Sequence, residues 1–238
     1  MERRKIGSGD AVQFYDSEAP RYDADYQQTV HHAEDRVMAG ILRRMLRRRD
    51  VFVVMDVGCG TGKLIELTRI NPCRYWGFDP ASRMIAAHNR RYPRHRADCM
   101  QWRSLTGVDQ FEFAVSLFGS LSHQADIWFA LEMIRRKLLP GGRVLLMFYG
   151  HRSAGRPSFI CGGQPVDTWT YDAETLRLEL GVYFEDVRVR GLTLLSERMI
   201  NLLPRWLAAA YLWLETQTLG RWFPDRAYAL IVTGRRGE

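Results

Sequence analysis

The chain has 238 residues, of which 46% are hydrophobic and 26% charged, so it is not a largely disordered protein and fits one large α/β domain. The net charge of +7 is compatible with nucleic-acid binding, but only three of the 34 basic residues are lysines, a skew typical of genome-wide codon bias. The four cysteines, Cys59, Cys73, Cys99 and Cys161, are scattered without metal-ligand spacing, so we expect neither disulfides nor a metal site.

No segment is expected to cross a membrane. Residues 1–10, MERRKIGSGD, lack the apolar core of a signal peptide. The most apolar stretch, LLPRWLAAAYLWL at 202–214, contains Pro204 and Arg205 and is shorter than the roughly 18 to 20 residues that a span requires. These features predict a cytoplasmic protein without a transmembrane segment, and they leave open a peripheral membrane contact through 202–214.

In chain order, apolar β-branched runs alternate with helical patterns, which predicts a parallel sheet covered on both faces. We expect a loose tail over 1–12, a helical segment over 14–26 and a helix over 30–48. Next come a strand over 51–57, a helix over 63–70, a strand over 74–78 that ends at Asp79, and a helix over 82–91. A third strand closes at Asp98, and a fourth strand over 111–117 precedes a helix over 127–138.

The second part of the chain departs from this regular alternation. PGG at 140–142 predicts a turn into a strand over 144–149, and SFICGGQPVDTW at 158–169 predicts a hairpin with a Gly-Gly turn. Asp172 is expected to cap a helix that runs to Leu180, with Gly181 beyond its end. Strands are expected over 184–191 and 228–233, and Ser196 opens a long helical region between them.

The stretch VVMDVGCGTGKL, residues 53–64, is a glycine turn after a strand. A phosphate-binding P-loop is excluded, because Val57 stands where its first glycine belongs and Leu64 where its hydroxyl belongs. The dinucleotide fingerprint G-x-G-x-x-G is weakened by Lys63 at its third glycine. The observed series is G-x-G-x-G.

That series, in the setting DVGCGTGKL, resembles the first motif of the class I S-adenosylmethionine-dependent methyltransferases. GFDPASRMIAAHNRR at 77–91, RADCMQW at 96–102 and SLFGSLSH at 116–123 support the resemblance, which runs over 14–236. It implies an α/β fold: a Rossmann-like, doubly wound, seven-stranded, mostly parallel sheet with helices on both faces and an antiparallel last strand. An N-terminal helical lid and an aromatic-rich helical insertion before the last strand complete the expected fold.

We therefore expect a single methyltransferase domain over 1–238. Residues 1–29 form the tail and lid, residues 30–150 the cofactor-binding core, and residues 151–238 the substrate-side loop, the helical insertion and the last strands.

The residue types of the motif suit S-adenosylmethionine for physical reasons. Glycines at 58 and 60 let the backbone approach a ligand closely, and Asp79 can accept hydrogen bonds from both ribose hydroxyls. The resemblance implies that Asp98 binds the adenine amine and Met84 covers one adenine face, although Met84 could instead be plain core and Asp98 a turn residue. The expected cofactor-binding residues are Tyr15, Tyr22, Asp56, Gly58, Cys59, Gly60, Gly62, Asp79, Pro80, Met84, Asp98, Cys99, Met100 and Leu117.

The stretch FYDSEAPRYDADY at 14–26 resembles the segment that folds over the cofactor in many of these enzymes. Tyr15 and Tyr22 are seven positions apart, so in one helix they would share a face and could close the site from above. The alternative is that both tyrosines only pack against the domain.

Two histidines follow strands at the edge where such sheets place their sites. His123 follows the fourth strand and His151 the fifth, and a histidine can take a proton near neutral pH. Both are candidate general bases, with the alternative that His123 only caps or packs beside the cofactor loop.

Motifs that are absent from the sequence narrow the class of methyl acceptor. The fourth strand ends in SLFGS rather than the D/N-P-P-Y of enzymes that methylate amines of nucleic acids, and no Asp-Asp-Asn metal arrangement is evident. The arginine clusters at 43–49, 90–96 and 135–137 are expected at the opposite edge of the sheet, so nucleic acid is not expected as a partner.

Aromatic residues in 152–170 and 196–223 predict a small, partly apolar methyl acceptor. The alternatives are a methyltransferase that modifies RNA or protein, and a protein that binds S-adenosylmethionine for different chemistry. Whether the chain is a monomer or a homodimer stays open.

Overall fold

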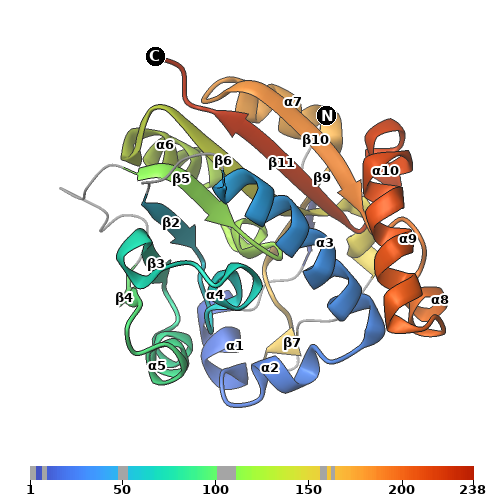
Figure 1. Cartoon of the computed structure of the whole chain (residues 1–238), viewed down its shortest axis with the longest axis horizontal. Helices are drawn as coiled ribbons and strands as arrows, with labels where there is room; N and C mark the ends of the chain where they lie inside the picture. Colours follow the sequence, from blue (N-terminus) through green and yellow to red (C-terminus); the bar gives the residue numbers. More distant parts are fainter. Residues whose placement is uncertain (1–3, 7–9, 48–52, 101–110, 156–159, 162–163) are drawn as a thin grey trace.

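The computed structural model describes residues 4–6, 10–47, 53–100, 111–155, 160–161 and 164–238 (Figure 1). Its central strands are β2 (Val54–Val57), β3 (Tyr75–Asp79), β4 (Arg96–Cys99), β5 (Phe111–Ser116), β6 (Leu138–Gly150), β10 (Glu185–Leu192) and β11 (Ala229–Arg235). They lie in the order β4-β3-β2-β5-β6-β11-β10, and β11 is antiparallel to both of its neighbours. The predicted mostly parallel arrangement of seven strands with an antiparallel last strand is confirmed as the centre of a larger sheet, which has nine strands within the ranges given above.

Helices cover both faces of this sheet, as the continuous burial of β2 requires. Val54 packs in a cluster with residues of α3 (Thr29–Leu46), α4 (Lys63–Thr68) and α5 (Ser82–Arg91). Met55 and Val57 pack in a second cluster with residues of α6 (Ile127–Lys137) and α7 (Ala173–Gly181). Successive side chains of a strand point to opposite faces, so the continuous apolar run of a parallel strand fills both layers.

Two further strands join the sheet at the end of β6, and they were not predicted. β9 (Thr168–Tyr171) pairs in parallel with Tyr149 and Gly150, and β1 (Arg4–Ile6) pairs antiparallel with β9. The expectation of a loose tail over 1–12 is therefore wrong for the residues of β1 and for Ala11 and Val12, which begin the first helix. The unpaired edge of β9 supplies hydrogen-bonding groups that hold β1 in place.

The predicted helical segment over 14–26 is two helices, α1 (Ala11–Glu18) and α2 (Tyr22–Asp25). Pro20 lies in the turn between them. Proline has no backbone N–H and its ring clashes with the preceding helical turn, so the helix cannot continue through it. Tyr15 and Tyr22 therefore belong to different helices, and the expectation that they share one helix face is wrong.

The remaining strands, turns and helices lie within a few residues of their predicted positions. The 140–142 turn stays within β6, because the backbone of Gly141 and Gly142 hydrogen-bonds Arg236 beyond β11. The predicted hairpin is present as β7 (Ile160–Cys161) and β8 (Gln164–Pro165), while its glycines, like the predicted strand residues 51–52, lie outside the described residues. Asp172 caps α7 by accepting a hydrogen bond from the N–H of Thr175.

The long helical region after Ser196 is divided into α8 (Glu197–Asn201), α9 (Arg205–Gln217) and α10 (Leu219–Trp222). Short 3-10 helices lie at Pro72–Arg74, Ser120–His123, His151–Gly155 and Pro224–Arg226. No helix in the described part of the chain is both long and apolar enough to span a bilayer.

Candidate active site

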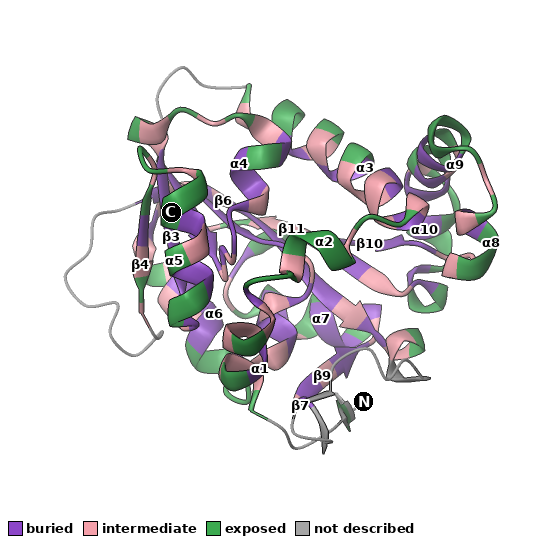
Figure 2. Ribbon diagram, turned by 90° about the horizontal axis from the view of Figure 1, so that it is seen from below, coloured by how far each residue is buried: buried purple, intermediate pink, exposed green. Residues whose placement is uncertain are grey.

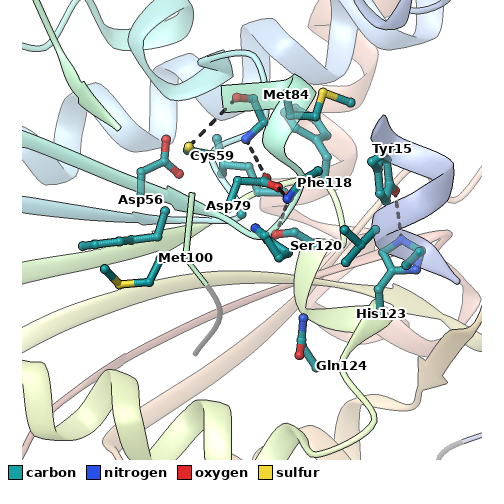
Figure 3. Close-up of a pocket in the computed structure, with 18 of the residues that line it drawn as sticks. Tyr15, Asp56, Cys59, Asp79, Met84, Met100, Phe118, Ser120, His123 and Gln124 are labelled. Carbon is teal, nitrogen blue, oxygen red and sulfur yellow. Dashed lines mark hydrogen bonds between the residues drawn. The ribbon is translucent and has the colours of Figure 1, made fainter. Parts of the chain in front are cut away.

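A cavity of about 580 Å³ lies at the carboxyl ends of β2, β3 and β5, beneath α1 and α2 (Figure 3). This is the edge where connections to neighbouring strands diverge and leave a crevice in doubly wound sheets. Twelve of the sequence-predicted site residues line the cavity: Tyr15, Tyr22, Asp56, Gly58, Cys59, Gly60, Asp79, Pro80, Met84, Met100, Leu117 and His123. Gly62, Asp98, Cys99 and His151 are not among its described lining residues.

The glycine loop is held against β3 and turns its open side toward the cavity. The N–H groups of Gly58 and Cys59 donate to the carbonyl of Phe78 at 2.7 and 3.1 Å. All three glycines have positive φ, with Gly60 at +51°. A Cβ on Gly58 would lie 2.4 Å from the Cβ of Ser120, whereas a Cβ on Gly60 would meet nothing within 4 Å.

The third glycine has a packing role in this structure. At Gly62 φ is +99°, and a Cβ would lie 2.6 Å from the ring of Tyr92. Gly62 therefore allows α4 to begin against α5, and its expected contact with the cofactor stays a prediction.

Asp79 ends β3 and fastens the glycine loop to the start of α5. Its carboxylate accepts hydrogen bonds from the N–H of Gly60 and from the N–H of Ala81, both at 2.9 Å. Burial raises the pKa of Asp79 to about 6, while these two backbone hydrogen bonds lower it. The carboxylate is thus presented at the cavity wall, where it can exchange a backbone partner for a ligand hydroxyl.

Asp56, in β2, is a second buried acid at the cavity. It is 2% exposed, and its carboxylate accepts a hydrogen bond from the hydroxyl of Tyr75 at 2.9 Å. Burial raises the pKa of Asp56 to about 7, while the Tyr75 hydrogen bond lowers it. The cavity therefore holds two carboxylates whose charge is poorly solvated, and a cationic ligand would stabilise both.

These raised pKa values predict how the stability of the ligand-free protein depends on pH. Because the folded pKa of Asp56 lies above its unfolded value of 3.8, its contribution to stability is fully present below that value and is lost as pH rises through about 7. We expect the free energy of unfolding, measured by urea denaturation, to fall more between pH about 5 and about 8 for the wild type than for Asp56→Asn. Equal pH profiles for the two proteins would contradict this assignment.

The apolar walls of the cavity come from the start of α5 and the end of β5. Met84 is 1% exposed and packs with Ala81, Val12 and Tyr15, so the lid and α5 share one small cluster. Phe118 and Ser120 also line the cavity (Figure 3).

Asp98, by contrast, accepts the indole N–H of Trp76 at 2.6 Å, and the Sγ of Cys99 lies 3.6 Å from the carbonyl of Pro80. An adenine contact for either residue stays a prediction.

The lid is tied down on both sides of the cavity. Asp16 in α1 accepts a hydrogen bond from the N–H of Arg83 at 2.7 Å, in the first turn of α5. Asp23 in α2 accepts one from the hydroxyl of Thr61 at 2.7 Å and pairs with Arg91 at 2.8 Å. Arg91 therefore binds the lid, so the expectation that its whole cluster lies at the far edge of the sheet is wrong.

Tyr15 and Tyr22 meet over the cavity although they belong to two helices. Their ring centroids are 6.0 Å apart, and burial raises the pKa of both hydroxyls well above the usual value. Both side chains thus stay neutral and close the site with two aromatic rings.

His123 lies beneath Tyr15 and is fixed through both ring nitrogens (Figure 3). Its Nδ1 lies 2.8 Å from the carbonyl oxygen of Asp167, which can only accept, so Nδ1 carries the proton. Its Nε2 then accepts a hydrogen bond from the hydroxyl of Tyr15, at 2.9 Å. Burial lowers the pKa of His123, so the ring is neutral and its Nε2 lone pair holds the hydrogen bond from Tyr15 at the cavity wall.

His151 lies outside the described lining of the cavity. It begins the 3-10 helix after β6, its Nδ1 lies 3.0 Å from the hydroxyl of Thr170, and its Nε2 lies 3.6 Å from a carboxylate oxygen of Asp172. The ring thus contacts β9 and the cap of α7, and this placement gives no geometric support to the expectation that His151 acts as a base.

A family model for the methyltransferase domain matches residues 29–234 of this chain. The chain belongs to the methyltransferase domain family. No curated protein matches it.

Solved structures of similar fold include the [4+2]-cyclase SpnF, at 21% identity over 98% of each chain with a TM-score of 0.65. The S-adenosylmethionine-dependent methyltransferase from Mesorhizobium loti is 18% identical over 83% of this chain and 96% of its own, with a TM-score of 0.57. The N-methyltransferase NodS from Bradyrhizobium japonicum, solved with S-adenosylhomocysteine, is 14% identical over 86% and 87%, with a TM-score of 0.58.

The cofactor of this methyltransferase domain is S-adenosylmethionine, and the cavity suits it. Its volume lies in the range of ordinary ligand sites, and the open side of Gly60 leaves room for close approach of the ligand. Asp79 can accept the ribose hydroxyls, and the two buried carboxylates complement a ligand that carries a sulfonium charge.

Several cavity residues were not predicted from the sequence. They include Asp10 and Val12 from the lid, Gln124, Asp126 and Phe129 from the start of α6, and Asp167 from the turn before β9. The sequence could have indicated the residues after His123 as part of the site, since they continue directly from the fourth strand. No sequence pattern places Asp10 and Asp167 at the site, because they reach the cavity only through the pairing of β1 and β9 and the packing of α1.

Proposed function

We propose that this enzyme transfers the methyl group of S-adenosylmethionine to an oxygen, nitrogen or carbon atom of a small, partly apolar metabolite. The observation that carries the proposal is His123: a neutral, half-buried histidine lines the same cavity as the glycine loop, with Nε2 hydrogen-bonded to Tyr15. When bound, the cofactor supplies an activated methyl group for in-line displacement.

The residues of the chain orient the cofactor, exclude water, accept a proton and bind the acceptor. Asp79 and the glycine loop orient the cofactor, and Tyr15 and Tyr22 exclude water from above. When Tyr15 releases its hydrogen bond to Nε2, this nitrogen can take the proton that an attacking hydroxyl or ammonium must lose. The carbonyl of Asp167, which already accepts the Nδ1–H, stabilises the imidazolium that forms. Phe118 and Phe129 give the acceptor side apolar walls.

The similar structures include the N-methyltransferase NodS, which supports a methyl-transfer enzyme. The thiols of Cys59, Cys73 and Cys99, which are free among the described residues, support a reducing, cytoplasmic setting. A second candidate function is non-methylating chemistry with the same cofactor, because the [4+2]-cyclase SpnF matches over 98% of both chains.

Release of S-adenosylhomocysteine, screened over a panel of small amines, phenols and carbon acids, tests the proposal. We expect stoichiometric release with at least one compound. Conversion of a compound without any S-adenosylhomocysteine would support the non-methylating candidate and contradict methyl transfer.

A further inference from the structure

The helical insertion before β11 presents an unusually apolar outer face. Thirteen large hydrophobic side chains of the described residues are exposed, and nine of them fall between Met199 and Phe223. Single exposed hydrophobics are normal on a protein surface, but a concentration of this kind marks an interaction site. Figure 2 shows α8 and α9 at one end of the molecule, with exposed residues on their outer sides.

The exposed residues of α9 follow a helical spacing. Trp206 and Ala210 are four positions apart, and Trp213 and Leu214 follow Ala210 by three and four positions, so these residues share one side of α9. Leu202, just before the helix, is also exposed, at 82%, with Trp206 at 67% and Trp213 at 51%. We call these five residues the tryptophan stripe. The opposite side of α9 is buried through Ala208, Ala209 and Leu212, which pack in the cluster with α3. The stripe is therefore not needed for packing within the chain.

The exposed charges carried by residues 198–222 are all positive, whereas Asp35 and Glu66 line the hollow beside Arg205 and Trp206. The exposed charged residues between positions 198 and 222 are Arg198, Arg205 and Arg221, and the only acid in this range, Glu215, is 2% exposed and accepts the N–H of Leu194. Arg221 belongs to α10, where Trp222 is 80% exposed. α10 lies against β10, and the charge of Arg221 is among the causes that lower the pKa of Arg190 in β10, after burial, so a further arginine lies near α10.

We propose that the tryptophan stripe, with its arginine rim, docks this enzyme on an anionic lipid surface. Tryptophan and leucine enter the boundary between headgroups and acyl chains, and arginines at the rim are attracted to anionic headgroups. The helix lies on the surface rather than crossing it, since α9 has only 13 residues.

A second copy of the chain fits this face less well. A two-fold interface places the same patch of both copies together, so Arg198, Arg205 and Arg221 would face like charges, and residues 198–222 offer no exposed acid to pair with them. An anionic membrane removes this repulsion and also buries the tryptophans. The inference does not depend on the acceptor or on the methyl transfer proposed above.

Co-sedimentation of the full chain with vesicles tests the proposal. We expect binding to phosphatidylcholine vesicles that contain phosphatidylglycerol, weaker binding to phosphatidylcholine alone, and weakening by salt. The double variant Trp206→Ser/Trp213→Ser should bind the anionic vesicles roughly tenfold less. Arg205→Glu/Arg221→Glu should lose the preference for anionic vesicles.

Matched controls separate docking from folding. Leu178→Ser/Val182→Ser replaces two side chains of α7 and the residue after it, which are 67% and 74% exposed, and should leave vesicle binding unchanged. All variants should keep wild-type circular dichroism and wild-type affinity for S-adenosylmethionine. Absence of wild-type binding to anionic vesicles, or equal loss in the α7 variant, would overturn the proposal. So would a wild-type dimer that the tryptophan variant converts to a monomer without vesicle binding in either form.

Discussion

Replacing His123 by alanine is expected to lower turnover by about a hundredfold to ten-thousandfold, while the dissociation constant for S-adenosylmethionine stays within about twofold. In the mechanism we propose, Nε2 of His123 is the proton acceptor at the cavity, whereas the glycine loop and Asp79 orient the cofactor. Turnover is measured as S-adenosylhomocysteine release with an acceptor found in the metabolite screen, and the affinity by calorimetric titration.

His151→Ala is the matched control, because this second histidine contacts Thr170 and Asp172 outside the described cavity lining. Its turnover should stay close to that of the wild type. Tyr15→Phe removes the hydroxyl that donates to Nε2 and should shift the pH profile of turnover more than it changes cofactor binding. Unchanged turnover in His123→Ala would remove this residue from the mechanism.

Asp79→Ala is expected to weaken S-adenosylmethionine binding by about a hundredfold, corresponding to about 3 kcal/mol for the loss of charge-assisted hydrogen bonds. The carboxylate holds the N–H groups of Gly60 and Ala81, and it is the group at the cavity wall that can accept the ribose hydroxyls. Calorimetric titration with S-adenosylmethionine measures the change.

Asp172→Ala controls for the loss of a helix-capping acid, since Asp172 caps α7 and does not line the cavity. It should lower stability by about 1 kcal/mol with unchanged cofactor affinity. If Asp79→Ala binds S-adenosylmethionine as tightly as Asp172→Ala does, Asp79 is not a cofactor-binding residue.

The strands and helices of the sheet could be predicted because each is encoded by a pattern among residues that are close in the sequence. β2 is buried throughout and β5 at every position except Glu112, the glycine series follows β2 directly, and the acid at the end of β3 comes about twenty residues later. Each of these is a short-range pattern that a parallel α/β sheet repeats. For the same reason the glycine loop and Asp79 were expected at the site before their geometry was known.

The features that escaped prediction depend on contacts between distant parts of the chain. Tyr15 and His123 are 108 positions apart, and the carbonyl of Asp167 reaches the same ring only because β9 pairs with the end of β6. β1 has only three residues and pairs only with β9, which leaves no periodic signal. His151 follows a strand at the expected edge, but the chain turns into a 3-10 helix there and directs the ring toward α7.

Titration of S-adenosylmethionine into a pair of glycine variants tests most directly that the glycine loop is the cofactor site. Gly60 and Gly141 both have positive φ, at +51° and +70°, and at neither would a Cβ meet another atom within 4 Å, but only Gly60 lines the cavity. Valine imposes similar backbone strain at both positions, so a difference in affinity between the two variants reports the effect of a side chain that fills the cavity. We predict that Gly60→Val loses detectable binding and Gly141→Val keeps wild-type affinity. Wild-type affinity in Gly60→Val would contradict the placement of the cofactor in this cavity.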